Sequence, residues 1–508
     1  MNSKIFSMGI NGLEAFVVTI ESDISKGMPS CEIVGLPDAS IKESKNRVRA
    51  AIKNSGFKFP VSRIIINLAP ADIRKTGSLY DLPILLSILK ANGQITDVPQ
   101  NSAFIGELSL SGDVCPVNGI LPMTIHAKQN GFQNIFVPEK NAVEAAAISG
   151  INVYPVKNVK EIIDHLESEK TITPQPQTNI QIKPSEFTLD FSQVKGQYNV
   201  KRALEIAAAG NHNVLLIGPP GSGKSMLAKR IPSILPEMTF DEIIETTKIH
   251  SIAGILQNNF PLITQRPFRT PHHTTSSAGL SGGGSIPQPG EISLAHNGVL
   301  FLDELSEFSR AAIETLRQPI EEGIITLSRA KIALTYPCSF MLIAATNPCP
   351  CGYFGHPNKQ CTCSPAAVSR YLSKISGPLL DRMDIHVEVS PVNFESLAST
   401  ERLETSATIR KRVNEARNIQ KERLKSINIT SNSRIPAHLL KKTCPMTEKA
   451  KIILEKAFNK LGLSARGYDK ILKISRTIAD LDKKEKIDFE HICEAIQYRS
   501  LDRKYWRK

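Results

Sequence analysis

A glycine-rich segment near the middle of the chain has the composition and spacing of a phosphate-binding loop. It reads GPPGSGKS and matches the pattern G-x4-G-K-[ST], with a strand-like apolar run before it and a helix-like run after it. Glycine lets backbone N–H groups turn toward phosphate oxygens at a helix N-terminus, where the helix dipole also favours an anion. We predict that Lys224 pairs with the β- and γ-phosphates of a nucleotide and that Ser225 ligates Mg²⁺; a simple glycine-rich turn is the alternative. The predicted nucleotide-binding residues are Gly218, Pro219, Pro220, Gly221, Ser222, Gly223, Lys224 and Ser225.

Two adjacent carboxylates end a second apolar run, GVLFLDE, at Asp303 and Glu304. A buried strand that delivers two carboxylates at its C-terminal end suits metal-assisted phosphoryl chemistry. In this interpretation Asp303 belongs to the Mg²⁺ shell, and Glu304 orients and deprotonates the attacking water. A surface acidic turn is the alternative, and the apolar residues before the pair argue against it. Together with the phosphate loop, the pair predicts hydrolysis rather than binding alone.

Two further polar residues follow the same arrangement of strands. The run SFMLIAATNP ends at Asn347, where an amide can hydrogen-bond the γ-phosphate or the attacking water. The segment SGPLLDRMDIHVEV places Arg382 after a short helical stretch. An isolated asparagine is usually a turn residue, and an isolated arginine is usually a surface charge. Beside the two motifs above, Asn347 is predicted to contact the nucleotide, and Arg382 to reach the γ-phosphate held by a neighbouring subunit.

The segment NPCPCGYFGHPNKQCTC contains four of the nine cysteines of the chain. Four soft thiolates suit tetrahedral zinc, and a metal is a better expectation than disulfides in a reducing compartment. The spacing C-x-C is tighter than the usual C-x2-C, so His356 replacing one thiolate, reduced cysteines in a turn and a redox switch remain alternatives. The segment lies between Asn347 and Arg370, which predicts a closed structural site without a part in hydrolysis. The predicted metal ligands are Cys349, Cys351, Cys361 and Cys363.

The composition is that of a globular protein of several domains. At 508 residues, with 41% hydrophobic and 22% charged residues, the chain corresponds to about three domains. No apolar run approaches the roughly 20 residues of a membrane span, and the first residues lack the pattern of a secretory signal. The five other cysteines are scattered, unlike a secreted disulfide framework. These features predict a cytoplasmic protein without a membrane segment.

The net charge of +13 is concentrated at the C-terminal end of the chain. Residues 401–508 hold 27 Lys/Arg against 14 Asp/Glu, so the remaining residues balance at 35 against 35. A basic region of this kind favours a polyanionic partner such as DNA. A solvated helical surface is an equally good reading of charge alone.

The alternation of apolar runs and helical periodicity divides the chain into four parts. Residues 1–168 show an α/β pattern, and residues 169–186 are polar, rich in proline and without periodicity, as in a linker. Residues 187–392 alternate strand and helix patterns again, as in a nucleotide-binding α/β domain. Residues 393–508 place apolar residues at spacings of three and four and read as helical.

The motifs GPPGSGKS, RPFRTPHHT, PGEISLAHNGVLFLDE, NPCPCG and GPLLDRMD, in this order, resemble those of the magnesium-chelatase-like AAA+ ATPases. The resemblance covers nearly the whole chain and implies a P-loop AAA+ domain with a helical C-terminal lid, acting with ATP and Mg²⁺. It implies sensor 1 at Asn347, an arginine finger at Arg382 and, in the segment LSARGYDKILKISRTIADL, sensor 2 at Arg466. Arg370 is a second candidate for the finger.

Two insertions resemble those of the chelatase and helicase branch of AAA+ proteins. The Gly/Ser-rich segment TTSSAGLSGGGSIPQPG (274–290) precedes the acidic pair, and this resemblance implies a loop in the pore of a ring. The alternating segment IITLSRAKIALTYP (324–337) resembles the hairpin before sensor 1. Its expected tip carries Arg329 and Lys331, which are suited to following a phosphate backbone. An ordinary edge ribbon with solubilising charges is the alternative.

The N-terminal part resembles the peptidase domain of Lon proteases in AFIGELSLSGDVCPVNGILPM and NIFVPEKNAVEAA. Lon chemistry requires a serine nucleophile and a lysine base. The nucleophile segment reads KTGSLYDLP, where Ser78 falls one position early, and ILPM stands where the lysine is expected. A Lon-peptidase-like domain without peptidase activity is therefore predicted.

The favoured interpretation is an ATP-driven hexameric motor on single-stranded or branched DNA. The branch of the family that the motifs most resemble consists of DNA branch-migration helicases acting in recombination during natural transformation, with recombination proteins as further expected partners. The alternatives are a chelatase-type motor subunit that remodels a partner protein, an ATP-dependent protease, and an ATP-regulated DNA-binding module without helicase activity.

Overall fold

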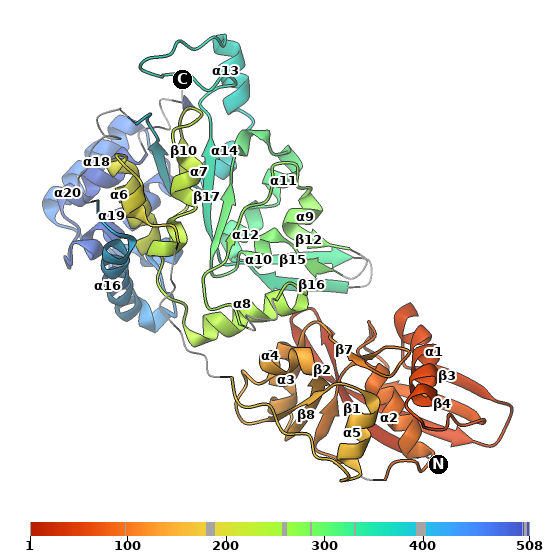
Figure 1. Cartoon of the computed structure of the whole chain (residues 1–508). Helices are drawn as coiled ribbons and strands as arrows, with labels where there is room; N and C mark the ends of the chain where they lie inside the picture. The colour runs from red at the N-terminus through yellow and green to blue at the C-terminus, as the bar shows by residue number, and fades with distance from the viewer. Residues whose placement is uncertain are drawn as a thin grey trace. The chain divides into compact units, whose positions relative to one another are not determined.

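The chain forms two compact units, each of mixed α/β structure. The computed structural model describes residues 2–96, 98–178, 188–256, 262–284, 287–329, 332–392, 403–499, 501 and 505–506 (Figure 1). Unit 1 comprises Met1–Ile182, Ile243–Ile263 and Ser328–Tyr336. Unit 2 comprises Lys183–Glu242, Thr264–Leu327 and Pro337–Lys508.

Unit 1 is built on a seven-stranded sheet with the order β3-β4-β2-β1-β5-β8-β9. The long hairpin β1–β2 and strand β4 are antiparallel neighbours, whereas β5, β8 and β9 continue from β1 in parallel. The strands are β1 (Asn2–Asn11), β2 (Glu14–Ser25), β3 (Ser30–Val34), β4 (Arg63–Ala69), β5 (Ser102–Phe104), β8 (Asn134–Pro138) and β9 (Asn152–Val156), with a separate ribbon of β6 (Glu107–Leu108) and β7 (Val114–Cys115). The helices are α1 (Ala39–Asn54), α2 (Asp81–Ala91), α3 (Ile120–Gln129), α4 (Ala142–Ala145) and α5 (Val159–Leu166).

The helices of unit 1 follow from local sequence. Helix α1 begins after Asp38, whose carboxylate accepts a hydrogen bond from the N–H of Ile41, which is the geometry of an N-cap. The buried residues of α1 recur at spacings of three and four, so one face of this helix lies against the core. Helix α2 reads DLPILLSILKA and is buried along almost its whole length. An apolar helix of this kind requires cover on every side, which makes α2 central to the core of unit 1.

Two segments of unit 1, Ile243–Ile263 and Ser328–Tyr336, were assigned by the sequence to the nucleotide-binding domain. The contacts of Ser251 explain the placement of the first. Its hydroxyl donates to the buried carboxylate of Glu144, and its carbonyl oxygen accepts from the N–H of Gly119 at 3.2 Å. The predicted range 187–392 treated the nucleotide-binding domain as one continuous segment, so it included residues that in fact belong to unit 1.

The predicted linker begins with residues that are attached to unit 1. The backbone N–H of Gln175 donates to the carbonyl of Val153 at 2.8 Å, and that of Thr178 donates at 2.9 Å to another carbonyl of the unit. Residues 179–187 lie outside the described part of the chain.

Unit 2 contains a five-stranded sheet with the order β11-β14-β17-β10-β18, in which every neighbouring pair is parallel. The expected α/β class with a parallel sheet is therefore confirmed. The strands are β10 (Val214–Ile217), β11 (Phe268–Arg269), β14 (Val299–Leu302), β17 (Met341–Thr346) and β18 (Ile385–Glu388), with a ribbon of β12 (Gly282–Gly283) and β13 (Gln288–Pro289). A further ribbon of β15 (Ile324–Arg329) and β16 (Ile332–Pro337) belongs to unit 1 from Ser328 to Tyr336. The helices of unit 2 up to β18 are α6 (Tyr198–Gly210), α7 (Lys224–Ala228), α9 (Ser277–Ser281), α10 (Glu291–Leu294), α11 (Arg310–Glu314), α12 (Arg317–Glu322), α13 (Pro365–Leu372) and α14 (Gly377–Leu380). Helix α8 (Phe240–Ile252) belongs to unit 1 from Ile243 onward.

The three central strands of this sheet are apolar because both of its faces are covered. Strands β10, β14 and β17 read VLLI, VLFL and MLIAAT, and all of their residues are buried. Continuous apolar runs are typical of parallel sheets with helices on both sides. The polar residues that follow these runs are thus delivered to one edge of the sheet.

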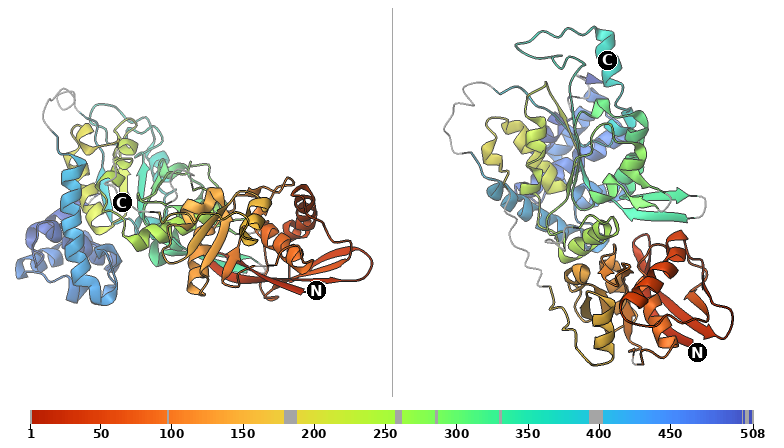
Figure 2. Two further views of the ribbon diagram at one scale, coloured as in Figure 1. Left: turned by 60° about the horizontal axis from the view of Figure 1, so that its bottom comes forward. Right: turned by 45° about the vertical axis from the view of Figure 1, so that its right-hand side comes forward.

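The C-terminal part of unit 2 is helical and shares an apolar core with the sheet. Its helices, coloured blue, lie together beside α6 (Figure 1; Figure 2). They are α16 (Ser406–Leu424), α17 (Leu440–Thr443), α18 (Glu448–Leu461), α19 (Ala465–Leu481) and α20 (Phe489–Gln497). No helix in the described residues combines the length and the apolar composition needed to cross a membrane.

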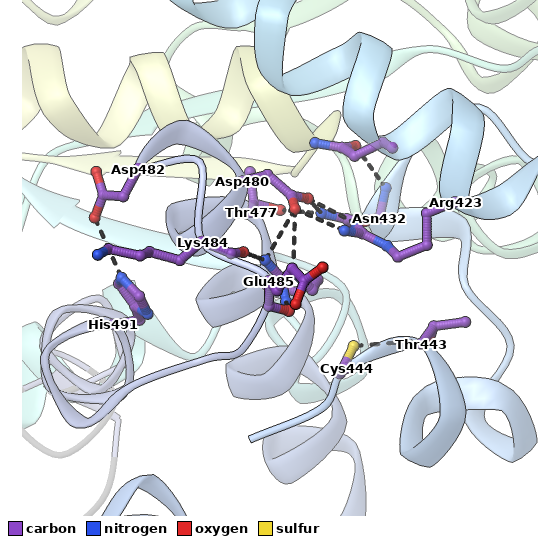
Figure 3. Close-up of polar contacts among 12 residues, drawn as sticks. Arg423, Asn432, Thr443, Cys444, Thr477, Asp480, Asp482, Lys484, Glu485 and His491 are labelled. Atoms are coloured by element: carbon purple, nitrogen blue, oxygen red, sulfur yellow. Dashed lines mark hydrogen bonds and ion pairs between the residues drawn. The ribbon is translucent and has the colours of Figure 1, made fainter. Parts of the chain in front are cut away.

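A buried carboxylate fixes helix α19 among its neighbours (Figure 3). Both oxygens of Asp480 accept bonds of 2.7 Å from the guanidinium of Arg423, and Asn432 and Arg476 donate to it at 2.8 and 3.1 Å. Because a buried charge without partners is strongly destabilising, this set of bonds holds α16 and α19 in one arrangement. At the same helix, Thr477 and the ring of His212 are joined at 2.8 Å, which connects α19 to the start of β10.

Candidate functional site

The predicted nucleotide-binding residues of unit 2 meet at the carboxyl-terminal edge of the parallel sheet. The phosphate loop follows β10, the acidic pair follows β14, and Asn347 follows β17. The last residue of β10, Ile217, pairs in register with Thr346 of β17. Parallel strands bring their ends to one edge, where open α/β sheets bind ligands. The three motifs, which are far apart in the sequence, are therefore neighbours at this edge of the sheet.

The conformation of the loop depends on glycine at specific positions. Gly221 and Gly223 have φ of 75° and 91°, in the left-handed region that glycine adopts without strain. A Cβ on Gly218 would lie 2.3 Å from the carbonyl oxygen of Val389, so only glycine fits there. Helix α7 begins at Lys224, directly after the loop. The N–H groups of this helix terminus are suited to an anion.

The ammonium of Lys224 lies inside the loop and already touches the residue predicted as sensor 1. Its Nζ donates to the carbonyl oxygens of Gly218 and Pro219 at 2.7 and 2.9 Å and to Oδ1 of Asn347 at 3.1 Å. Burial lowers the pKa of Lys224 to about 8, and the carboxylates of Asp303 and Glu304 oppose this shift. The nearby carboxylates do not fully compensate the burial of this cation. The site is therefore suited to bind the negatively charged phosphates of a nucleotide.

The two carboxylates after β14 have different surroundings. The hydroxyl of Ser225 donates to Oδ2 of Asp303 at 2.5 Å, so the two predicted Mg²⁺ ligands are already adjacent. Hydroxyl and carboxylate oxygens are the hard donors that Mg²⁺ prefers, and this pair therefore fits the ion. Glu304 instead has φ of 51°, an uncommon value for a residue other than glycine, and its side chain is 58% exposed. Asp303 is thus placed to hold a metal and Glu304 to meet solvent water.

His273 is a residue of this site to which the sequence analysis gave no role. Its Nδ1 lies 3.5 Å from Oε2 of Glu304, and its ring contacts that of His272 at an angle of 34°, with centroids 4.1 Å apart. The motif RPFRTPHHT contains both histidines, so its composition was the available signal. In the same motif Arg269 pairs with Glu291 through two bonds of 2.7 Å. This ion pair attaches the loop after β11 to helix α10.

Arg382 lies at the opposite edge of the sheet from the phosphate loop. It precedes β18, and β18 pairs in parallel with β10 so that Ile385 lies opposite Val214. The side chain of Asn213, just before β10, donates to the carbonyl oxygen of Arg382 at 3.2 Å. Arg382 is thus anchored at the amino-terminal edge of the strands.

The other two predicted arginines lie at different places in unit 2. Arg466 is in the first turn of α19, and its Nη2 lies 4.0 Å from Glu321, the carboxylate that also binds Arg382. Arg370 is exposed at the end of α13. Its neighbour Tyr371 hydrogen-bonds with Thr346 at the end of β17, so Arg370 belongs to the edge that carries the phosphate loop.

The four cysteines predicted to bind metal come together in one cluster. Their Sγ atoms all lie within 4.8 Å of one another, and three of the separations are 3.3, 3.6 and 3.7 Å. A disulfide requires about 2.05 Å, so the thiols are free. Zinc with Zn–S distances of about 2.3 Å places tetrahedral sulfur atoms about 3.8 Å apart. The spacing therefore fits a zinc ion, and His356, whose Nδ1 accepts two backbone N–H bonds of 3.0 Å, is not part of the cluster.

The loop that carries the cluster touches the phosphate loop. A Cβ on Gly352 would lie 2.4 Å from Cδ of Pro220, so the backbone of the cysteine loop packs directly on the proline ring. Within the cysteine loop, the N–H of Phe354 points to Sγ of Cys349 at 3.3 Å, and the N–H of Cys351 points to Sγ of Cys363 at 3.4 Å. Such bonds stabilise thiolates and fix metal ligands in place.

Comparison with known proteins places this geometry in a family. Residues 190–397 match the family described as magnesium chelatase, subunit ChlI; residues 20–141 match subunit ChlI of Mg-chelatase; and residues 403–499 match the ChlI C-terminal region. The chain is 44% identical over 510 residues to competence protein ComM of Haemophilus influenzae, which covers 98% of this chain and 97% of that protein. The chain belongs to the magnesium-chelatase-like AAA+ ATPase family.

Other members of the family differ in how much of the chain they match. The chain is 41% identical over 497 residues to the uncharacterized protein YifB of Escherichia coli, covering 97% of this chain and 96% of that protein. The magnesium-chelatase 67 kDa subunit of Chlorobaculum tepidum is 27% identical over 207 residues, covering 40% of this chain and 27% of that protein. Membership of this AAA+ family implies ATPase activity with ATP and Mg²⁺.

The residues predicted to contact DNA lie at the edge of the described structure. The segment 324–337 forms the ribbon of β15 and β16, in agreement with the expected hairpin. Arg329 is the last residue of β15, but its side chain and all of Lys331 lie outside the described residues. In the other insertion, the described residues form α9 and the ribbon of β12 and β13.

The region expected to correspond to a peptidase site has other contacts. The hydroxyl of Ser78 donates to the carboxylate of Glu107, rather than to a lysine base. Helix α3 begins at Ile120, and its residues Leu121 and Met123 are buried among apolar neighbours at the position where Lon chemistry requires the lysine.

Proposed function

We propose that this chain is a ring-forming, ATP-driven motor that moves on DNA and remodels branched intermediates during recombination in natural transformation. The observation that carries the proposal is the distribution of nucleotide-binding groups over the two edges of one sheet. Lys224, Asp303, Glu304 and Asn347 lie at the carboxyl edge, whereas Arg382 lies at the amino edge. A site divided in this way is completed by a second copy of the chain.

The geometry of the strands separates the two parts of the site. A strand rises about 3.3 Å per residue, so the four residues of β10 separate its edges by about 13 Å. The guanidinium of Arg382 therefore serves the nucleotide of a neighbouring subunit rather than its own. Head-to-tail contacts of this kind close into a ring, and a hexamer is the ring proposed here.

The residues of the proposed composite site have different roles in ATP hydrolysis. Bound Mg–ATP would supply the phosphoanhydride bond, and Ser225 and Asp303 would hold the metal. Lys224 neutralises phosphate charge. Glu304 orients the attacking water and accepts its proton, while Asn347 keeps the water and Lys224 in place. Arg382 and Arg466 stabilise the charge that develops on the phosphate.

The proposal of DNA as the partner is supported by the full-length likeness and by charge. A relative that matches 98% of this chain is named a competence protein. Residues 401–508 carry a surplus of basic residues that favours a polyanion. We propose that Arg329 and Lys331 at the ribbon and the 274–290 loop contact the DNA backbone, and that the motor acts in the cytoplasm together with recombination proteins.

The cysteine cluster is proposed to hold one structural zinc ion. Four thiols at tetrahedral spacing leave no open position for a water or a substrate, so the ion has no part in hydrolysis. Its loop instead supports Pro220 of the phosphate loop through Gly352. Because the cluster starts two residues after Asn347, the metal also fixes the segment that positions this amide.

Unit 1 is proposed to be a Lon-peptidase-like scaffold without peptidase activity, followed by a linker, the AAA+ domain and a helical lid. The pairing of Ser78 with Glu107 supports this proposal, since a carboxylate does not lower the barrier to proton loss in the way that a lysine base does.

The proposal is tested by strand displacement on forked and four-way DNA, with ATP and with a non-hydrolysable analogue. We expect displacement and branch migration with ATP alone, together with faster ATP hydrolysis when DNA is added. The likeness to the magnesium chelatase family favours a second candidate, a motor subunit that remodels a partner protein. ATP hydrolysis that DNA leaves unchanged, with no displacement, would support this second candidate and contradict the DNA motor.

A further inference from the structure

Two arginines predicted to act on a nucleotide converge on a single carboxylate of their own subunit. Glu321 lies in helix α12, and its Oε1 is 2.5 Å from Nη2 of Arg382. The same oxygen is 4.0 Å from Nη2 of Arg466. These three residues come from α12, from the turn before β18 and from the first turn of α19, which are far apart in the sequence. The carboxylate thus connects the finger residue to the sensor 2 residue at the amino edge of the sheet.

The surroundings of Arg382 show that its other donors are poorly satisfied. Its side chain is only 13% exposed, Nη1 donates to the carbonyl of Pro378 at 2.6 Å, and Nε is buried without a hydrogen-bond partner among the described residues. A guanidinium presents its donors in a fixed plane that matches carboxylate and phosphate oxygens equally well. Glu321 is the carboxylate to which Arg382 is bound, so this ion pair fixes the position of the Arg382 guanidinium.

Glu321 itself is suited to temporary binding. Its side chain is 49% exposed, so it lies at the surface, where another anion can compete with it for the arginines. Arg466 is 64% exposed and is separated from Glu321 by more than a direct hydrogen bond. An anion that bound between the two arginines would therefore displace only the carboxylate of Glu321. The apolar core of unit 2 would keep its packing.

We propose that Glu321 is a place-holder for phosphate, which holds Arg382 and Arg466 within their own subunit until the nucleotide of a neighbouring subunit competes for them. This inference rests on the proposed function, because it assumes that Arg382 acts across a subunit interface. Glu321 is a positioning residue: it touches neither ATP nor water but sets the availability of the arginines. After hydrolysis it recaptures them, which opens the interface for release of ADP.

The proposal has a thermodynamic consequence for ATP binding. When a binding-competent state is only partly populated, the apparent dissociation constant rises in proportion. If the ion pair favours the held state by about tenfold, removing the charge of Glu321 lowers the apparent KM for ATP by about tenfold. The protein concentration that gives half-maximal ATPase activity falls as well, because free arginines strengthen ATP-dependent assembly.

The test compares Glu321→Gln with Glu322→Gln in the full-length protein. Both residues are in helix α12, but Glu322 accepts a bond of 2.8 Å from Gln318 of the same helix. We expect Glu321→Gln to lower the apparent KM and the half-maximal concentration by about five- to tenfold, and Glu322→Gln to leave both unchanged. Unchanged or raised values for Glu321→Gln would overturn the proposal.

Two further measurements separate this proposal from a structural role and from the proposed function. In the double variant Glu321→Gln/Arg382→Ala, the decrease in the apparent KM for ATP must disappear. The midpoint of thermal unfolding of Glu321→Gln must stay close to that of the unaltered protein. A lower midpoint with a parallel loss of activity would show a merely structural ion pair. If Arg382→Ala alone leaves ATP hydrolysis intact, the finger assignment fails; if it stops hydrolysis while Glu321→Gln has no effect, only the place-holder fails.

Discussion

The conformation of Glu304 separates it from the acidic residue beside it. Asp303 is tied to Ser225 at 2.5 Å, whereas Glu304 adopts a left-handed backbone and points its carboxylate toward solvent near His273. Backbone strain of this kind is kept where it positions a reacting group. The arrangement fits a division in which one carboxylate holds the metal and the other handles the proton of water.

This division predicts different defects for two substitutions in the same site. Glu304→Gln keeps the shape of the side chain and removes its basicity, so ATP binding and assembly persist while turnover falls by roughly 10² to 10⁴-fold. Lys224→Ala instead removes the cation that meets the phosphates and weakens nucleotide binding itself. Equilibrium binding of a fluorescent ATP analogue and steady-state phosphate release distinguish the two. Turnover of Glu304→Gln within a few-fold of the unaltered protein would show that another group is the base.

The sequence predicted some residues of this site and not others for a physical reason. Lys224, Asp303 and Asn347 each follow an apolar run, and parallel strands bring the ends of such runs together. His273 and Glu321 have no such signal. Their partners are reached through irregular loops and helix ends, and the spacing of residues along a chain carries no information about such contacts.

At the scale of elements, the cysteine loop connects the cluster of four thiols to the phosphate loop. Gly352 lies against Pro220, and the cluster follows shortly after Asn347, which bonds Lys224 at 3.1 Å. A metal that holds this loop therefore acts on both the phosphate loop and the sensor 1 residue.

We expect one zinc ion per subunit by elemental analysis of protein purified without chelator. Cys361→Ser combined with Cys363→Ser should lose the metal and weaken ATP binding, because the loop that packs on Pro220 and carries the chain from Asn347 would no longer be held. Cys493→Ser, in helix α20 and outside the cluster, is the matched control. Metal-free protein that binds and hydrolyses ATP normally would contradict a supporting role for the cluster.

The sequence predicted the parallel sheet of unit 2 correctly but assigned helix α8 to the wrong unit. The parallel sheet follows from fully apolar runs such as VLFL and MLIAAT, which have few other stable placements. The assignment of α8 to unit 1 did not follow from the sequence, because α8 has the composition of an ordinary helix and Ser251 contacts unit 1 through residues distant in the sequence, Glu144 and Gly119. Local periodicity predicts that a helix forms, but not which core it joins.

At the scale of the whole molecule, the two candidates for the arginine finger lie on opposite edges of the sheet of unit 2. Arg382 precedes β18 at the amino edge, and Arg370 lies beside Tyr371 at the carboxyl edge. The proposed function assigns Arg382 to the nucleotide of a neighbour, whereas the place of Arg370 at the carboxyl edge assigns it to the nucleotide of its own subunit. We therefore expect opposite outcomes for the two residues when variant subunits are mixed and ATP hydrolysis is measured.

Mixing subunits that carry Lys224→Ala with subunits that carry Arg382→Ala should restore ATP hydrolysis that neither variant has alone. In a random mixture of equal amounts, about a quarter of the interfaces of a cyclic ring pair an intact phosphate loop with an intact finger. Mixing Lys224→Ala with Arg370→Ala should restore nothing, because a neighbouring subunit cannot replace an arginine that serves the nucleotide of its own subunit. Phosphate release measured across a series of mixing ratios checks both expectations. Recovery with Arg370→Ala but not with Arg382→Ala would exchange the roles of the two residues and would also remove the basis for Glu321 as a place-holder.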